Sequence, residues 1–169
     1  LQYNTDVFYY DYSSSQVSSL ENIQGNFVIY TRSVPVKISG WENELHWRPT
    51  ANDTVDASLV FESSHYVRFM AGLLADVDWS GRSLDKTPGT AGTFGYSHVF
   101  DLPDDRNIVF HVQSKYSSAF LLSDIQNALQ YKQRPFTRSD MTLTYNLKGG
   151  DMYVHAYVKN LENKVQMLA

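Results

Sequence analysis

The chain has 169 residues, a formal net charge of −4 and no cysteine, and only 19% of its residues are charged. These values exclude thiol catalysis, disulfides and thiolate metal sites, and the acidic balance lacks the electrostatic footprint of a nucleic-acid-binding protein. Aromatic residues make up 14% of the chain, with 12 Tyr and 9 Phe. Because aromatic residues favour strands over helices, the composition predicts an all-β domain or a piece of a larger one.

A period of two, in which apolar and polar residues alternate, predicts strands along most of the chain. In chain order, the predicted strands are residues 1–12, 41–47, 55–62, 94–100, 108–116, 141–147 and 152–158. Residues 1–12 carry aromatic side chains on both faces, whereas most of the other segments have one apolar and one polar face. The pattern gives seven strands, or eight if residues 27–32 form a separate one. Short helical turns are expected only at residues 69–75 and 123–129.

Short and long connections alternate between these strands. The short ones are residues 48–53, 102–107 and 148–151, which are rich in turn formers, and the long ones are residues 13–26, 68–90 and 122–136. A soluble sandwich with Greek-key links has no reason to alternate in this way, whereas a transmembrane barrel has short periplasmic turns and long extracellular loops. The two-residue period by itself fits either fold, because both bury one face of each strand.

Five stretches carry more specific patterns. Residues 38–49 read Ile-Ser-Gly-Trp-Glu-Asn-Glu-Leu-His-Trp-Arg-Pro, and residues 80–88 read Ser-Gly-Arg-Ser-Leu-Asp-Lys-Thr-Pro. The others are residues 7–12, 56–61 and 153–164. In this order and spacing they resemble the C-terminal half of the barrel of TonB-dependent receptors. The first is similar to the family's Gly-x-Glu-x-Glu-Leu-x-Trp-x-Pro stretch and the second to its Gly-x-x-Leu-x-x-x-Pro loop. The last is similar to its near-terminal strand end, which usually has Thr where Glu162 stands.

The resemblance implies an all-β fold: an antiparallel meander of about 7–8 transmembrane strands, part of an outer-membrane barrel of about 22 strands. Residues 1–169 are then expected to be a partial receptor barrel that lacks the plug domain, the TonB-interacting motif and the terminal strand. The implied partners are outer-membrane lipid, the receptor's own plug domain, an energy-transducing TonB-type complex of the inner membrane, and a small-molecule or metal-chelate substrate. The implied location is the bacterial cell outer membrane.

The function that the resemblance implies is uptake of a scarce nutrient, such as a ferric siderophore, a cobalamin-like cofactor or an oligosaccharide. Two alternatives stay open: a complete eight-stranded outer-membrane barrel with a structural or adhesin role, and a soluble lipocalin-like binder. An enzyme is not expected, because the sequence has no Gly-x-Ser-x-Gly elbow, His-Glu-x-x-His pair or phosphate-cradling glycine loop. No catalytic residue, cofactor or nucleic-acid partner is therefore predicted.

Two groups of candidate functional residues follow from the expected barrel. The lumen-facing group comes from the polar strand faces and consists of Glu42, Glu44, His46, Asp56, His111, Gln113, Lys115 and Lys159. The ligand-contact group comes from the long loops and consists of Tyr66, Arg68, Trp79, Arg82, Tyr131, Lys132 and Arg134. Arg with aromatic side chains suits anionic chelates or stacked sugar rings. No metal site is predicted, because alternate side chains of one strand point in parallel rather than toward one ion.

Overall fold

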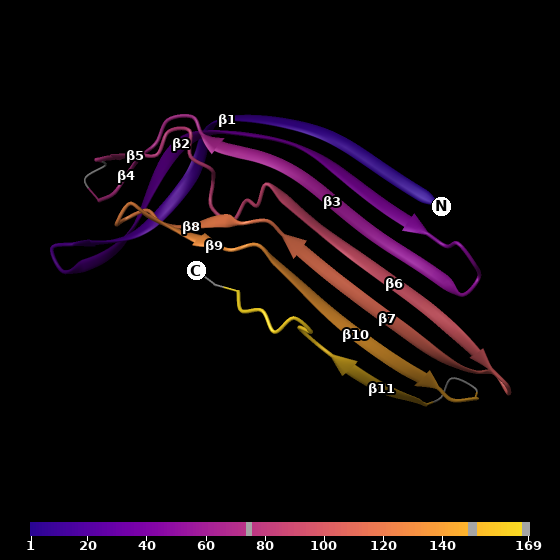
Figure 1. The fold of residues 1–169 in the computed structure, drawn as a ribbon. Helices are drawn as coiled ribbons and strands as arrows, with labels where there is room; N and C mark the ends of the chain where they lie inside the picture. Colours follow the sequence, from indigo (N-terminus) through magenta and orange to yellow (C-terminus); the bar gives the residue numbers. More distant parts are fainter. Residues whose placement is uncertain (74–75, 149–151, 167–169) are drawn as a thin grey trace.

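The computed structural model describes residues 1–73, 76–148 and 152–166 of the chain. Within these residues, one antiparallel sheet has the strand order β1-β2-β3-β6-β7-β10-β11 (Figure 1). Its strands are β1 (Gln2–Ile23), β2 (Asn26–Trp47), β3 (Asp53–Tyr66), β6 (Thr90–Leu102), β7 (Arg106–Ser117), β10 (Phe136–Asn146) and β11 (Tyr153–Val158). The prediction of an all-β antiparallel meander is confirmed. In the part of the chain that the structure describes, no helix is long and apolar enough to cross a membrane.

Two further pairs of strands lie in the long connections. The short strands β4 (Met70–Ala71) and β5 (Val77–Asp78) pair with each other between β3 and β6. The strands β8 (Phe120–Asp124) and β9 (Leu129–Gln133) form a hairpin between β7 and β10. Both pairs lie at the same end of the sheet, opposite the short turns that follow β2 and β6 (Figure 1). Two of the three predicted long connections, residues 68–90 and 122–136, and the short turns after β2 and β6 are therefore present, whereas residues 149–151 of the third predicted turn lie outside the described residues.

The prediction of a loop at residues 13–26 is wrong. The strands β1 and β2 continue beyond the sheet as a two-stranded ribbon that stays paired up to Ile23 and Asn26 (Figure 1). The ribbon closes through Gln24 and Gly25, whose φ angles of 53° and 87° suit the tight hairpin turn that matches strand twist. Residues 27–32 are accordingly a continuous part of β2 and not a separate strand. Serine-rich segments read as loops by composition, but their short side chains also accept an extended, paired backbone.

The predicted helical turns are also wrong where the structure describes them. Residues 70–71 belong to β4, and residues 123–129 contain the end of β8, a turn and the start of β9; residues 74–75 lie outside the described part. The backbone amides of Gly72 and Leu73 donate to the carbonyls of Ile125 and Gln126, each over 2.9 Å. The two segments thus satisfy their backbone groups against each other, which removes the need for local helical hydrogen bonds.

The strand register gives the sheet two chemically different faces, because residues that pair directly share a face. The polar face carries Asp6, Glu42, Glu44, His46, Asp56, Ser58, Thr93, Ser97, His111, Gln113, Lys115, Arg138, Asp140 and Thr142. The apolar face carries Val7, Trp41, Leu45, Leu59, Phe61, Phe94, Phe110, Val112, Met141, Leu143 and Val158. Many side chains of the apolar face are exposed, including Phe94 at 49% and Leu143 at 47%.

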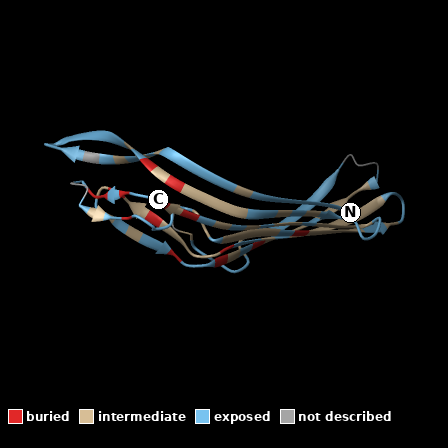
Figure 2. Cartoon of the chain, turned by 90° about the horizontal axis from the view of Figure 1, so that it is seen from above, coloured by how far each residue is buried: buried red, intermediate tan, exposed pale blue. Residues whose placement is uncertain are grey.

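The buried core lies at the end of the sheet that bears the long connections (Figure 2). It consists of Val34, Val36, Tyr66, Phe69, Ala71, Trp79 and Ile125. These side chains come from β2, the end of β3 and the long connections, so the connections pack onto one end of the sheet. The rest of the sheet is a single layer with no second sheet against it among the described residues.

Candidate functional site

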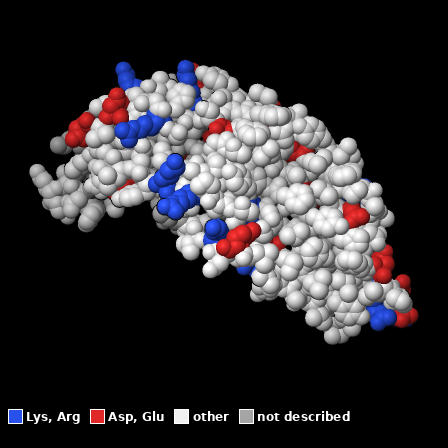
Figure 3. All heavy atoms as spheres, in the orientation of Figure 1, with Lys and Arg blue, Asp and Glu red and all other residues white. Residues whose placement is uncertain are grey.

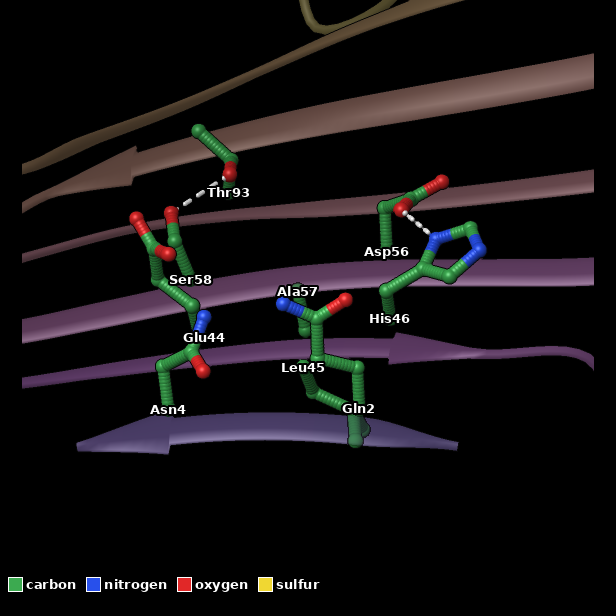
Figure 4. A pocket seen from close by; sticks show the side chains of 9 residues that line it. All are labelled: Gln2, Asn4, Glu44, Leu45, His46, Asp56, Ala57, Ser58 and Thr93. Atoms are coloured by element: carbon green, nitrogen blue, oxygen red, sulfur yellow. Dashed lines mark hydrogen bonds and ion pairs between the residues drawn. The ribbon is translucent and has the colours of Figure 1, made fainter.

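A hollow of about 280 Å³ opens on the polar face across β1, β2, β3 and β6 (Figure 4). It is lined by Gln2, Asn4, Glu44, Leu45, His46, Asp56, Ala57, Ser58 and Thr93. The His46 ring turns toward Asp56, and its Nδ1 lies 2.6 Å from Asp56 Oδ1 (Figure 4). Both side chains are largely open to solvent, so this pair adds little to stability. The hollow offers amide, hydroxyl and carboxylate groups, which is the chemistry of hydrogen-bonded recognition.

A smaller hollow of about 160 Å³ adjoins this one and is lined by Asn4, Thr5, Asp6, Glu42 and Glu44. Asp6 pairs directly with Glu42 across β1 and β2, so two carboxylates stand opposite each other on one face. Like charges in directly paired positions destabilise a sheet. Neither hollow has a Lys or Arg in its lining.

Seven of the eight predicted lumen-facing residues lie on the polar face: Glu42, Glu44, His46, Asp56, His111, Gln113 and Lys115. The eighth, Lys159, follows Val158, the last paired residue of β11. The register of β6 and β7 places Lys115 opposite Thr93, and the Oγ of Ser97 lies 2.8 Å from Nδ1 of His111. The strand register therefore brings these side chains to one face of the sheet. That this face lines a lumen stays a prediction.

Three aromatic rings that the site prediction did not include lie on the same polar face. Phe8, Tyr10 and Tyr12 occupy alternate positions of β1, with ring centroids 5.5 Å and 5.8 Å apart in succession. The interplanar angles are 32° and 23°, so Phe8 is tilted against Tyr10, and Tyr10 stacks on Tyr12. We name this feature the ring ladder. The signal in the sequence was the aromatic alternation in residues 1–12, which placed rings on both faces of the strand.

The two long connections form one interlocked body, the loop unit (residues 67–73, 76–89 and 118–135). Its backbone bonds include the Lys86 amide donating to the Leu121 carbonyl over 2.9 Å. The Arg82 Nη1 donates to Gln130 Oε1 over 3.0 Å, and the Ser123 hydroxyl donates to Asp85. Because these bonds join two segments distant in sequence, the loop unit is held together by tertiary contacts in addition to the pairing of β4 with β5 and of β8 with β9.

Two carboxyl groups of the loop unit have pKa values that are shifted in opposite directions. Burial raises the pKa of Asp85 above its ordinary value of 3.8, although the hydrogen bond from Ser123 acts the other way. The hydroxyl and backbone amide of Ser80 lower the pKa of Asp78 below the same ordinary value. The amide of Ser80 donates to Asp78 Oδ1 over 2.8 Å, and its hydroxyl accepts from the Phe69 amide over 3.1 Å.

The predicted ligand-contact residues do not form one surface. Trp79 is fully buried and Tyr66 is 3% exposed, so both belong to the buried core and offer no surface to a ligand. Arg82 is exposed but bonded to Gln130, and its guanidinium lies 5.9 Å from the centre of the Trp79 ring. Arg68 is exposed as well. Burial of these aromatic rings depends on loop packing, which no local pattern of the sequence encodes.

Positive charge gathers at the end with the long connections, as the face drawn in Figure 3 shows. Lys132, Arg134 and Lys164 line a hollow of about 410 Å³ together with Phe136. Tyr131, beside Lys132, is 54% exposed. Three predicted ligand-contact residues thus lie at or beside a cationic hollow that is separate from the acidic hollows of β1 and β2.

No protein-family model matches the chain, and no curated protein matches it. Its fold matches the crystal structure of the siderophore receptor PiuA from Acinetobacter baumannii with a TM-score of 0.72 at 14% sequence identity. The match covers 97% of this chain and 22% of that chain, so the chain spans about a fifth of the length of the receptor. The meander is therefore similar in fold to part of a TonB-dependent receptor barrel. The matched structure is that of a receptor and not of an enzyme.

Proposed function

We propose that the chain is part of the barrel wall of an outer-membrane receptor that takes up a scarce nutrient across that membrane. One observation carries the proposal: a single-layer meander with an exposed apolar face, a polar face, short turns at one end and long connections at the other. A strand wall in lipid needs this combination, because its outer face contacts hydrocarbon and its inner face contacts water or protein. The match in fold to a siderophore receptor supports the same interpretation.

The sheet edges support a segment of a larger barrel over a complete small barrel. In the described sheet, β1 and β11 are the two edge strands and do not pair with each other. A barrel in lipid must close, because each unpaired backbone group in hydrocarbon costs several kcal/mol. Further strands of the receptor would pair with both edges. The plug domain and the TonB-interacting motif would belong to the same missing portion.

In this proposal the apolar face contacts outer-membrane lipid and the polar face lines the lumen toward the plug domain. The loop unit then faces the outside of the cell. The exposed members of the predicted ligand-contact group contact the incoming nutrient; they are Arg68, Arg82, Tyr131, Lys132 and Arg134. The substrate is a ferric siderophore, a cobalamin-like cofactor or an oligosaccharide. Energy for uptake comes from a TonB-type complex of the inner membrane.

The first test is the intact mass of the native gene product and the cell fraction that holds it. A receptor with about 22 strands and a plug has a mass several-fold above 19.3 kDa and is extracted from the outer membrane. A native mass near 19.3 kDa would contradict the proposal and favour the small barrel, and recovery without detergent would favour a soluble binder.

The second test concerns the loop residues. In the intact receptor, Arg82→Ala and Arg134→Ala variants are compared with the wild type for uptake of the nutrient by whole cells. The proposal expects reduced uptake from at least one variant at unchanged receptor abundance. Unchanged uptake in both variants would remove these residues from the ligand site without affecting the assignment of the barrel wall.

A further inference from the structure

The short turn between β6 and β7 places charged groups at the rim of the exposed apolar face, at the end of the sheet opposite the loop unit (Figure 1). We propose that this turn binds the head group of a phospholipid with a primary ammonium, such as phosphatidylethanolamine. In this site Arg106 donates hydrogen bonds to the lipid phosphate, and the carboxylates of Asp104 and Asp105 accept hydrogen bonds from the lipid ammonium. The inference rests on the proposed function, because it assumes that the apolar face contacts the bilayer.

The side chain of Arg106 lies on the apolar face of the sheet. Arg106 is the first residue of β7 and stands two positions before Ile108, which pairs with Phe100 of β6 and with Tyr145 of β10. Because alternate residues of a strand share a face, Arg106 is on the same side as these three residues. Its Nη1 donates to the hydroxyl of Tyr145 over 3.4 Å, so the guanidinium extends over that face toward β10. A cation therefore stands at the edge of the surface that contacts lipid in the proposed function.

A cation in this position requires an anionic partner that the membrane itself supplies. Charged side chains on the lipid face of a strand wall are destabilising near the middle of the bilayer and are tolerated at its interfaces, where the head groups lie. Arg106 is at the end of its strand, beside the short turn, and so lies at such an interface. Phe100 on the same face is 49% exposed, which leaves an apolar surface next to the guanidinium for the acyl chains of the bound lipid.

The guanidinium of Arg106 is held in place and keeps donors for a phosphate. Its Nε donates to the carbonyl of Pro103 over 2.9 Å, and its Nη2 lies 3.4 Å from Oδ2 of Asp104. Together with the bond to Tyr145, these contacts with described residues use three of the five N–H groups of an Arg side chain. The side chain is 37% exposed, so the remaining N–H groups can reach a ligand. A fixed guanidinium matches the geometry of phosphate oxygens better than an ammonium does.

The two carboxylates of the turn determine which lipid fits. Asp104 and Asp105 are both exposed, and their positive φ angles of 62° and 56° close the turn tightly in front of Arg106. A lipid with a net negative charge is repelled by these carboxylates, whereas a zwitterionic lipid offers a phosphate to Arg106 and a cation to the acids. A primary ammonium donates hydrogen bonds, and a quaternary ammonium has no N–H to donate. The turn therefore suits phosphatidylethanolamine better than phosphatidylglycerol or phosphatidylcholine.

The experiment uses the intact receptor in detergent and native mass spectrometry, which counts the lipids bound to each receptor. The probes are phosphatidylethanolamine, phosphatidylcholine and phosphatidylglycerol with the same acyl chains, each titrated separately. The test variants are Arg106→Gln and the combination of Asp104→Asn with Asp105→Asn. The matched control is Arg48→Gln, because Arg48 is an exposed cation in the short turn after β2, at the same end of the sheet. Electrophoretic mobility without heating confirms folding of each variant.

We expect the wild type to bind phosphatidylethanolamine more tightly than the other two lipids. Arg106→Gln should bind it about fivefold more weakly, while Arg48→Gln binds it as the wild type does. The double Asn variant should lose the preference over phosphatidylglycerol, because the carboxylates that repel the anionic lipid are gone. If Arg106→Gln does not assemble, Tyr145→Phe replaces it. This variant removes the hydroxyl that orients the guanidinium, and a smaller loss of phosphatidylethanolamine binding is expected.

Three results would overturn the inference. One is equal binding of phosphatidylethanolamine by the wild type and the variant at Arg106. Another is an equal loss from Arg48→Gln, which would mean that lipid phosphates are attracted to any cation at this end of the sheet. The third is a wild type that does not distinguish the three lipids. Each leaves the proposed function intact if the native mass and membrane fraction are those of a receptor, whereas a soluble 19.3 kDa product contradicts the proposed function first.

Discussion

The ring of Phe8 lies so close to Gly40 that no other residue fits opposite it without a shift. A Cβ placed on Gly40 would lie 2.4 Å from Phe8 Cζ and 2.6 Å from the backbone carbonyl oxygen of Phe61. The phenyl ring can move aside, but the carbonyl belongs to β3 and is fixed by the sheet. Gly40 therefore sets both the spacing of β2 and β3 and the position of the first ring of the ladder.

The substitution Gly40→Ala is expected to lower the free energy of unfolding of the intact receptor by about 1–3 kcal/mol, the usual result of overpacking. Urea unfolding in lipid vesicles measures this change. The matched control is Gly89→Ala, because a Cβ on Gly89 would have its nearest neighbour, the Glu62 carbonyl oxygen, at 3.6 Å. Equal stability of the two variants would contradict the close approach at Gly40.

Removal of the Trp79 ring is expected to loosen the loop unit and the end of the sheet on which it packs, and to leave the rest of the sheet intact. Trp79 is fully buried and packs edge-on against Phe69, with ring centroids 5.7 Å apart. Replacing a buried Trp by Ala costs about 3–5 kcal/mol, and Trp79 joins the loop unit to one end of the sheet, where it belongs to the same core cluster as Val36 and Tyr66. Hydrogen exchange should then speed up at the amides of Gly72 and Lys86, which bond across the unit. Leu73→Ala is the control, because Leu73 is 44% exposed; the same effect from both variants would contradict the core role of Trp79.

The features of the fold that could be predicted from the sequence are those that side-chain alternation and turn-forming residues determine locally. The alternation of side chains in β2 and β10 fixes which residues share a face, because successive residues of a strand point to opposite sides. Turn formers such as Pro49 and Pro103 mark the short connections. Seven strands, two faces and one end with long connections were therefore predictable.

The part that did not follow depends on pairing between distant segments. Residues 13–26 are polar and serine-rich, and only the pairing of β1 with β2 makes them a ribbon. Trp79 and Tyr66 read as exposed loop aromatics, but contacts with Phe69 and Val36 bury them. The ring ladder was overlooked for a different reason: aromatic residues on both faces of β1 masked the alternation that identified the other polar faces.

The loop unit is expected to respond to pH through Asp85. Its pKa is raised in the folded state, so the ionised carboxylate opposes loop packing at neutral pH. As the pH falls through the folded pKa, Asp85 takes up a proton and packing strengthens, and the gain is complete below the unfolded value of 3.8. Asp78 acts in the opposite sense, because its pKa is lowered and its contribution fades as the pH falls below 3.8.

The substitution Asp85→Asn separates the pH dependence that comes from Asp85 from that of Asp78. The amide oxygen can still accept from Ser123, while the charge is gone, so the loop unit should resist proteolysis at neutral pH at least as well as the wild type. The variant should also lack the increase in resistance to proteolysis that the wild type shows on mild acidification. Limited proteolysis with an acid-tolerant protease at both pH values measures this. An unchanged rise in the variant would assign the pH response to another group.

The two faces of β10 are expected to differ in their tolerance of charge. Leu143 is 47% exposed on the apolar face and pairs with Phe110, whereas the neighbouring Thr142 lies on the polar face and pairs with His111. In a lipid-facing wall, Leu143→Arg should destabilise the folded barrel by about 2–4 kcal/mol near the middle of the bilayer, and Thr142→Arg should cost far less. Folded receptor in the outer membrane is quantified for each variant by its electrophoretic mobility without heating. A similar loss of folded receptor from both substitutions would mean that the apolar face does not contact lipid. An Arg that faces water would be tolerated equally well on either face.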